Sequence, residues 1–126
     1  MFAAHASGVP RSWALRVALG VGALAGATAG VMVAGSSAWQ PWVFLIAPDV
    51  ALLAGISRGL NPGQLHPRAV TLYNALHMFA SPTALAVVSV WLAPVWLGAA
   101  LAWTAHVLFD RAVGFGLRDH AGYIAR

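Results

Sequence analysis

The chain has 126 residues, of which 60% are hydrophobic and 8% are charged, and its net charge is +4. A soluble domain carries about 25% charged residues, so this composition excludes a soluble enzyme, a disordered tail and a nucleic-acid-binding module. Cysteine is absent, which excludes disulfides and thiolate metal sites. The class that remains is a small integral membrane protein.

Four apolar segments are long enough to cross the roughly 30 Å of hydrocarbon in a bilayer. They cover residues 13–35, 39–57, 69–93 and 95–117. The first also has the charge pattern of a signal peptide, but its apolar run is longer than a signal core, and we interpret it as an uncleaved helix. The sequence therefore predicts an all-α fold, a four-helix transmembrane bundle that forms one integral membrane domain over residues 1–126.

The positions of the basic residues predict the orientation of this bundle. With a cytoplasmic N-terminus, every arginine lies on the cytoplasmic side, and the two opposite turns carry none. These residues are Arg11, Arg16, Arg58, Arg68, Arg111, Arg118 and Arg126. Tryptophans gather at the other interface, namely Trp39, Trp42, Trp91 and Trp96. We expect a multi-pass protein of the bacterial cytoplasmic (inner) membrane with both termini cytoplasmic, in contact with lipids and without a nucleic-acid partner.

The first segment carries Gly22, Gly26 and Gly30 at four-residue spacing, which places them on one helix face. Such a face lets another helix approach closely in lipid. Glycine is also common in membrane helices in general. The pattern favours close packing, against either the protein's own bundle or a partner protein.

Ionisable residues in the other segments share one depth. At 1.5 Å per residue, Asp49, His77, His106 and Asp110 lie roughly 10–16 Å from the cytoplasmic edge. His106 and Asp110 are four residues apart and so project from one face. A charge that faced lipid would cost several kcal/mol, so these groups should point into the bundle and meet there.

Polar residues and prolines accompany this layer. On the third segment, Thr71, Asn74, His77 and Ser81 form one stripe, with Tyr73 one turn before His77. Pro48 should leave the carbonyl of Phe44 without its helical partner, and Pro82 should act similarly after Ser81. These two breaks predict a small hydrated pocket that opens towards the cytoplasm.

Three interpretations of the layer stay open. His77, His106, Asp49 and Asp110 could bind zinc, manganese or iron and activate water. The same groups could form a proton relay or small-ligand site. They could also form a hydrogen-bond network that holds the helices in register, which Arg111 favours because it can neutralise Asp110. A haem ligated by His77 or His106 is disfavoured, because Asp110 occupies the same stripe.

Three groups of residues form a recognisable pattern. They are Pro48-Asp49, Tyr73-Asn74 with His77, and His106 with Asp110-Arg111 and Gly114-Phe115-Gly116-Leu117-Arg118. Over roughly residues 42–123 this pattern resembles domain-of-unknown-function family 4260, small bacterial four-helix membrane proteins. The resemblance implies the same architecture and nominates Asp49, Asn74, His77, His106, Asp110 and Arg111. The family pattern continues into a Thr-His segment that this chain lacks, which disfavours an intact enzyme.

Two functions are therefore predicted. The first is a non-enzymatic accessory or structural subunit, without a cofactor, of a larger membrane complex such as an energy-transducing assembly. The alternative is a metal-dependent membrane hydrolase that acts on a lipid-soluble substrate. In the alternative, the His/Asp cluster binds the metal, Asn74 orients the substrate or a ligand, and Arg111 meets a phosphate or carboxylate. The incomplete family pattern favours the first.

Overall fold

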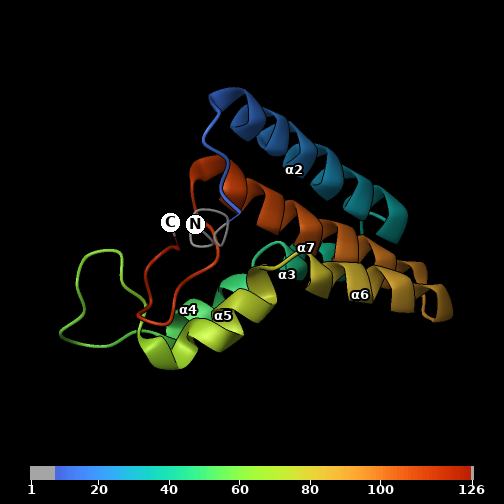
Figure 1. The fold of residues 1–126 in the computed structure, drawn as a ribbon. Helices are drawn as coiled ribbons and strands as arrows, with labels where there is room; N and C mark the ends of the chain where they lie inside the picture. The colour runs from blue at the N-terminus through green and yellow to red at the C-terminus, as the bar shows by residue number, and fades with distance from the viewer. Residues whose placement is uncertain (1–7, 126) are drawn as a thin grey trace.

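The computed structural model describes residues 8–125, and they form an all-helical fold (Figure 1). Its elements are α2 (Trp13–Ala34), α3 (Gln40–Phe44), η1 (Ala47–Asp49), α4 (Val50–Ala54), η2 (Pro67–Ala69), α5 (Val70–His77), α6 (Ala80–Val88), η3 (Ser89–Trp91) and α7 (Pro94–Val113). Within the described residues the only extended pairing is an isolated antiparallel bridge between Arg118 and Ile124. The predicted all-α class is confirmed.

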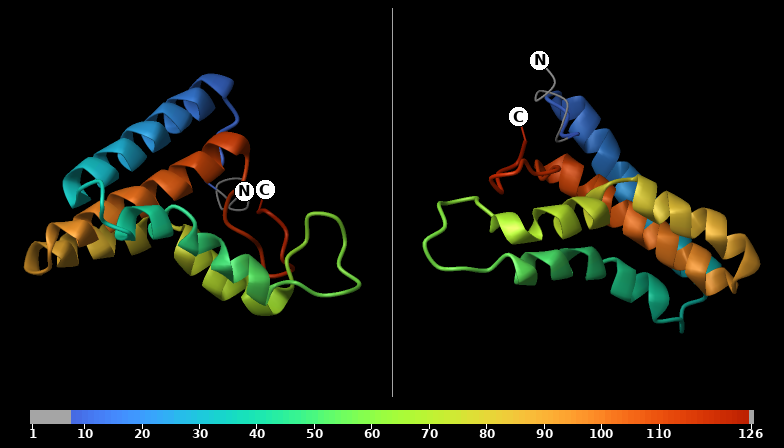
Figure 2. Two further views of the ribbon diagram at one scale, coloured as in Figure 1. Left: turned by 180° about the vertical axis from the view of Figure 1, so that it is seen from behind. Right: turned by 60° about the horizontal axis from the view of Figure 1, so that its bottom comes forward.

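Helices α2 and α7 lie side by side and antiparallel (Figures 1 and 2). A Cβ atom built on Gly30 would lie 2.7 Å from the carbonyl oxygen of Gly98. A Cβ atom on Gly26 would meet the Cβ of Ala105 at 3.4 Å, and one on Gly22 would lie 3.6 Å from the Leu108 side chain. The glycine face of α2 therefore packs on α7 of the same chain.

The second and third predicted segments are each divided into two shorter helices. Pro48 lies in η1, between α3 and α4, and Pro82 lies in the first turn of α6. A proline ring clashes with the carbonyl four residues earlier, and for Pro82 that residue is Met78. Met78 has an extended backbone with ψ 148° and separates α5 from α6. The segments 39–57 and 69–93, in which breaks were expected at Pro48 and Pro82, are thus divided into shorter helices.

Helix α7 ends at Val113, four residues before the predicted boundary. Gly114 adopts a left-handed conformation with φ +103°, which terminates a helix. The chain then folds back over α5 and the loop before it. The backbone nitrogen of Leu65 donates to the carbonyl of Gly122 at 2.9 Å, so the segment 114–125 is fixed to that loop.

Arginine-bearing segments gather at one end of the molecule. The start of α2, the loop between α4 and η2, and the chain after α7 lie close together in both views of Figure 2. At the other end, the rings of Trp39 and Trp96 meet edge to face, with centroids 6.1 Å apart. Arg126, which the topology prediction also used, lies outside the described residues. Trp39 and Trp96 therefore lie at the opposite end from the arginine-bearing segments.

Burial is inverted relative to a soluble protein. The buried side chains are mostly small or polar, among them Ala51, Ala99, Ala102, Ala105, His77 and Arg111. Large apolar side chains are exposed instead, including Leu24 (72%), Met32 (76%) and Ile46 (71%). Exposed apolar surface on this scale marks contact with a partner or with lipid. Among the described residues, α2 is the one helix long and apolar enough by itself to cross a membrane.

Candidate metal centre

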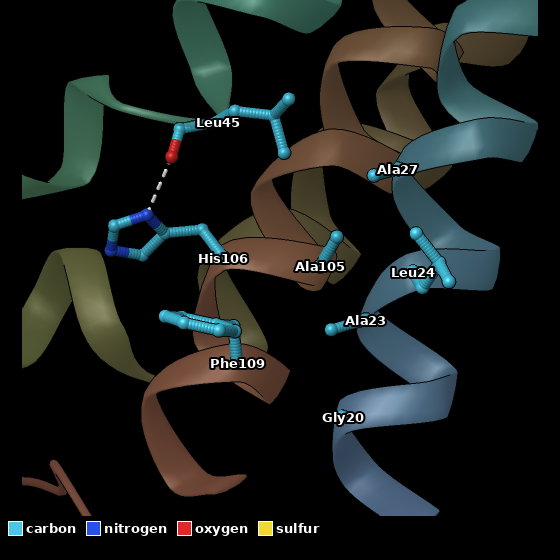
Figure 3. A pocket seen from close by; sticks show the side chains of 8 residues that line it. All are labelled: Gly20, Ala23, Leu24, Ala27, Leu45, Ala105, His106 and Phe109. Carbon is cyan, nitrogen blue, oxygen red and sulfur yellow. Dashed lines mark hydrogen bonds between the residues drawn. The ribbon is translucent and has the colours of Figure 1, made fainter. Parts of the chain in front are cut away.

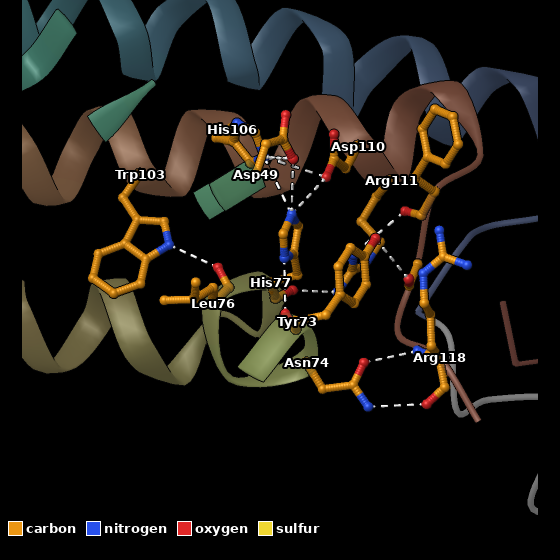
Figure 4. Close-up of polar contacts among 12 residues, drawn as sticks. Asp49, Tyr73, Asn74, Leu76, His77, Trp103, His106, Asp110, Arg111 and Arg118 are labelled. Atoms are coloured by element: carbon orange, nitrogen blue, oxygen red, sulfur yellow. Dashed lines mark hydrogen bonds and ion pairs between the residues drawn. The ribbon is translucent and has the colours of Figure 1, made fainter. Parts of the chain in front are cut away.

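Two histidines and two aspartates converge on one point between α7 and the two broken helices (Figure 4). The Nε2 atoms of His77 and His106 are 3.3 Å apart. Asp49 Oδ1 lies 3.2 Å from each Nε2 atom, and Asp110 Oδ2 lies 3.4 Å from each. All four ligand atoms lie within 4.8 Å of one another.

The helix breaks bring these side chains together. Asp49 is the last residue of η1, directly after Pro48, and His77 is the last residue of α5. His106 and Asp110 lie one turn apart on the buried face of α7. Three separate segments therefore bring these four side chains to one point.

The tautomer of each histidine is fixed by a backbone carbonyl. His77 Nδ1 lies 2.8 Å from the carbonyl oxygen of Tyr73, and His106 Nδ1 lies 2.6 Å from that of Leu45. A carbonyl only accepts, so each Nδ1 carries the proton and donates it. A neutral imidazole in this tautomer directs a lone pair from Nε2. With both rings neutral and both carboxylates ionised, the cluster would consist of four acceptors.

Five of the six distances among the four ligand atoms match those around a tetrahedral cation, and the sixth, between Asp49 and Asp110, is at most 4.8 Å. Zinc bonds of about 2.0–2.1 Å place tetrahedral ligand atoms about 3.3–3.4 Å apart. The five separations given above span 3.2–3.4 Å. Octahedral ligands at Mg²⁺ distances would lie about 2.9 Å apart, which is shorter than these separations. The donor set of imidazole and carboxylate also suits zinc.

The cluster is closed on three sides and open on one. The His77 side chain is fully buried, and those of His106 and Asp110 are 8% and 12% exposed. Asp49 is 45% exposed. Water or a substrate group can therefore reach the cluster from the side of Asp49.

Side chains from α6 and α7 satisfy the carbonyls that the break after α5 releases. The Trp103 indole donates to the carbonyl of Leu76 at 2.8 Å, and Arg111 Nη2 donates to that of His77 at 2.7 Å. Ser81 donates its hydroxyl proton to the carbonyl of Ala75. Non-helical backbone at membrane depth persists only where such partners exist.

Trp103→Phe is expected to destabilise the fold by about 1–3 kcal/mol, because the Leu76 carbonyl loses its donor. Thermal unfolding of the detergent-solubilised protein measures this loss. Trp91→Phe serves as the matched control, because Trp91 is 77% exposed and should leave the melting temperature unchanged. Equal melting temperatures for the two variants would show that the indole bond is not needed.

Arg111 contacts backbone rather than a carboxylate. Besides the carbonyl of His77, its guanidinium donates to the carbonyl of Phe115 at 3.3 Å. Its Nε atom is buried without a hydrogen-bond partner among the described residues. The neutralisation of Asp110 through direct pairing with Arg111, which favoured a purely structural network, is not the arrangement found.

Asn74 and Tyr73 hold the chain after α7. Asn74 Nδ2 donates to the carbonyl of Arg118 at 2.9 Å, and its Oδ1 accepts from the Arg118 nitrogen at 2.8 Å. Tyr73 stacks on His77 with ring centroids 4.0 Å apart, and its hydroxyl donates to the carbonyl of Gly116 at 3.3 Å. Asn74 therefore positions the C-terminal segment, while Tyr73 supports a ligand histidine.

The sequence did not indicate a role for Leu45 or Trp103. The carbonyl of Leu45 accepts from His106, and the indole of Trp103 donates to the carbonyl of Leu76. We expected Pro48 to release the carbonyl of Phe44, but the carbonyl that reaches His106 belongs to Leu45. In η1 the Asp49 nitrogen donates to the carbonyl of Ile46 at 3.0 Å instead of continuing an α-helix. Pro48 was the signal in the sequence, and it indicated the carbonyl of Phe44, one residue before Leu45.

Comparison with known proteins identifies one family. Residues 14–125 match the model of a family described as domain of unknown function (DUF4260). No curated protein and no solved structure matches the chain.

Proposed function

The chain belongs to the DUF4260 family, and for this member we propose a metal centre within the membrane that serves hydrolysis of a lipid-soluble substrate. Asp49, His77, His106 and Asp110 would bind one divalent ion, preferably zinc. The observation that carries the proposal is the pair of Nε2 atoms 3.3 Å apart, each on an imidazole whose Nδ1 proton is already donated.

A network of protons alone accounts for this cluster less well. With both Nδ1 protons donated to carbonyls, a network needs further protons on the carboxyl groups or on Nε2. Two charged rings, with their Nε2 atoms 3.3 Å apart in a buried site, would repel each other. A divalent cation between the four ligand atoms would instead attract each of them. The Nδ1 bonds to carbonyls are also the second-shell partners typical of metal-bound histidine.

A bound zinc ion supplies Lewis-acid activation of water or of a carbonyl or phosphoryl oxygen. His77, His106 and Asp110 form the buried part of the site, and the two Nδ1 bonds hold the imidazole rings in place. Asp49 faces the exposed side, and its Oδ2 atom, which is not the proposed ligand atom, can orient water or accept a proton there. This division of roles supports hydrolysis at the open side of the cluster.

The membrane part of the proposal follows from surface and charge. The broken helix over residues 40–54 would form the second span, and the one over residues 67–91 would form the third, beside α2 and α7. We infer a cytoplasmic side at the arginine-bearing end and both termini on that side, in a bacterial inner membrane. The exposed apolar side chains support this arrangement because lipid can cover them.

The accessory-subunit hypothesis has less support. It relied on the incomplete family pattern and on the glycine face of the first helix as a surface for a partner protein. That face packs on α7, so the outer side of α2 presents large side chains such as Leu24 and Met32 rather than a close-contact surface. The proposed metal centre needs no partner.

Elemental analysis tests the proposed function directly. The full chain is purified from membranes in mild detergent without chelator, and about one zinc ion per chain is expected, because the four side chains form one site. Dialysis against a chelator should remove the ion, and added Zn²⁺ should restore it. A protein that holds no stoichiometric metal, either as purified or after addition of Zn²⁺, Mn²⁺ and Fe²⁺, would overturn the proposal.

Topology can be tested cleanly because the chain has no cysteine. Ser37→Cys, in the turn after α2, is expected to react with a membrane-impermeant maleimide from outside intact spheroplasts. Asn61→Cys, in the loop after α4, should react only after the membrane is permeabilised. Labelling of both positions in intact cells would contradict the four-span arrangement with cytoplasmic termini.

A further inference from the structure

An apolar pocket lies between α2 and α7, beside the candidate metal centre (Figure 3). Its volume is about 360 Å³. Gly20, Ala23 and Ala27 on α2 face Ala105 on α7, and these small side chains leave the space. Of the side chains that line it in the described chain, His106 alone is polar. One ligand histidine of the cluster is thus a wall of the pocket.

A second pocket of about 280 Å³ extends the first along α2. The two share Ala27 and Leu45, and the second continues to Met32 and Trp42. From Gly20 to Met32, the groove that they form spans roughly 18 Å along the helix axis at 1.5 Å per residue. That length accommodates an extended hydrocarbon chain. Leu45 links groove and cluster, because its side chain lines both pockets and its carbonyl holds His106.

A cationic side chain lies at the arginine end of the same groove. Arg16 precedes Gly20 by four residues, so the two share one face of α2. Its Nε atom donates to the carbonyl of Ala112 at 2.9 Å, which holds the guanidinium against the end of α7. An amphiphile in the groove would therefore place its head beside a positive charge and its tail towards Met32.

We propose that this groove binds the hydrocarbon tail of an anionic lipid whose headgroup pairs with Arg16. This binding does not rest on the proposed function. The groove opens between Leu24 and Phe109, which are 72% and 55% exposed, so the tail enters sideways from the bilayer. His106 then lies beside the part of the hydrocarbon tail that is nearer the headgroup.

Photolabelling of the full chain tests this site. The protein is placed in phosphatidylcholine nanodiscs that contain phosphatidylglycerol with a diazirine in its acyl chain, and labelled peptides are mapped by mass spectrometry. Label is expected to concentrate on the groove residues Leu24 and Ala27 rather than on the equally apolar Leu53 and Ile56, which are 67% and 66% exposed. Uniform labelling of all exposed apolar residues would overturn the proposal.

Two variants sharpen the experiment. Ala27→Leu fills the groove and should lower the groove label about tenfold, the cost of displacing roughly two methylene groups. Ala25→Leu, on the exposed side of the same helix, is the matched control and should label as wild type. Arg16→Gln should remove the preference for phosphatidylglycerol over a phosphatidylcholine probe while tail labelling persists. Equal labelling of the Ala27→Leu and Ala25→Leu variants would contradict the site.

The outcomes separate this inference from the proposed function. Labelling needs no metal. If the groove is labelled in a protein that holds no zinc, the lipid site is supported and the proposed hydrolase is contradicted. A protein that binds zinc but labels uniformly would keep the metal centre and remove the lipid site. If Ala27→Leu does not fold, the wild-type labelling pattern alone decides.

Discussion

His77→Ala and His106→Ala are each expected to abolish stoichiometric zinc binding in the purified protein. Each removes one of only two imidazole ligands from a four-ligand site. Loss of a mere second-shell partner typically costs 10–100-fold in metal affinity, and loss of a ligand should cost more. Metal analysis after equilibration with buffered Zn²⁺ measures the effect.

The aspartates should differ from each other in the same assay. Asp110→Asn removes a ligand that is 12% exposed and is expected to weaken binding strongly. Asp49→Asn removes the exposed ligand, which water can replace, so partial binding should persist. His120→Ala, an exposed histidine outside the cluster, is the control and should bind as wild type. Full zinc occupancy in His77→Ala would refute the ligand assignment.

Stability gives a second, independent readout of the same site. A ligand that binds the folded state alone stabilises it, by about 2.7 kcal/mol at a free concentration of 100 times the dissociation constant. A chelator should therefore lower the melting temperature of the wild type and leave that of His77→Ala unchanged. A structural hydrogen-bond network would show no chelator effect in either protein.

The four cluster residues could be predicted from sequence because acidic side chains are rare in this apolar chain. Asp49 and Asp110 are two of only three acidic residues, and the expected cost of exposing them to lipid predicted that they would meet His77 and His106. The state of each imidazole could not be predicted in this way. It depends on which backbone carbonyl lies near Nδ1, and a carbonyl leaves no mark in the sequence.

The role of Asn74 was misjudged for a related reason. A polar residue on a stripe with His77 was expected to face a ligand, but it pairs with the backbone of Arg118. The signal lay in Gly114, where a left-handed residue ends α7 and sends the following chain back over α5. The predicted fourth span ran to residue 117, so the return of the chain that brings Arg118 to Asn74 was not expected.

Gly30→Leu is expected to prevent or strongly destabilise folding, because α2 and α7 meet there backbone to backbone. A Cβ on Gly30 would lie 2.7 Å from the carbonyl oxygen of Gly98, and one on Gly98 would lie 2.6 Å from that of Gly30. Neither backbone can yield without moving its helix. Even Gly30→Ala should cost about 1–3 kcal/mol through overpacking, more than the roughly 1 kcal/mol that alanine adds in helix propensity.

The matched substitution Gly22→Ala should have the opposite sign. A Cβ there would lie 3.6 Å from a Leu108 methyl group, an ordinary van der Waals contact, so the propensity gain remains. Unfolding in mixed micelles, titrated with a denaturing detergent, compares the two alanine variants on one helix. If Gly30→Ala is as stable as Gly22→Ala, the two helices do not meet at Gly30 and Gly98. Such a result would also contradict the packing described for α7, the helix that carries His106 and Asp110.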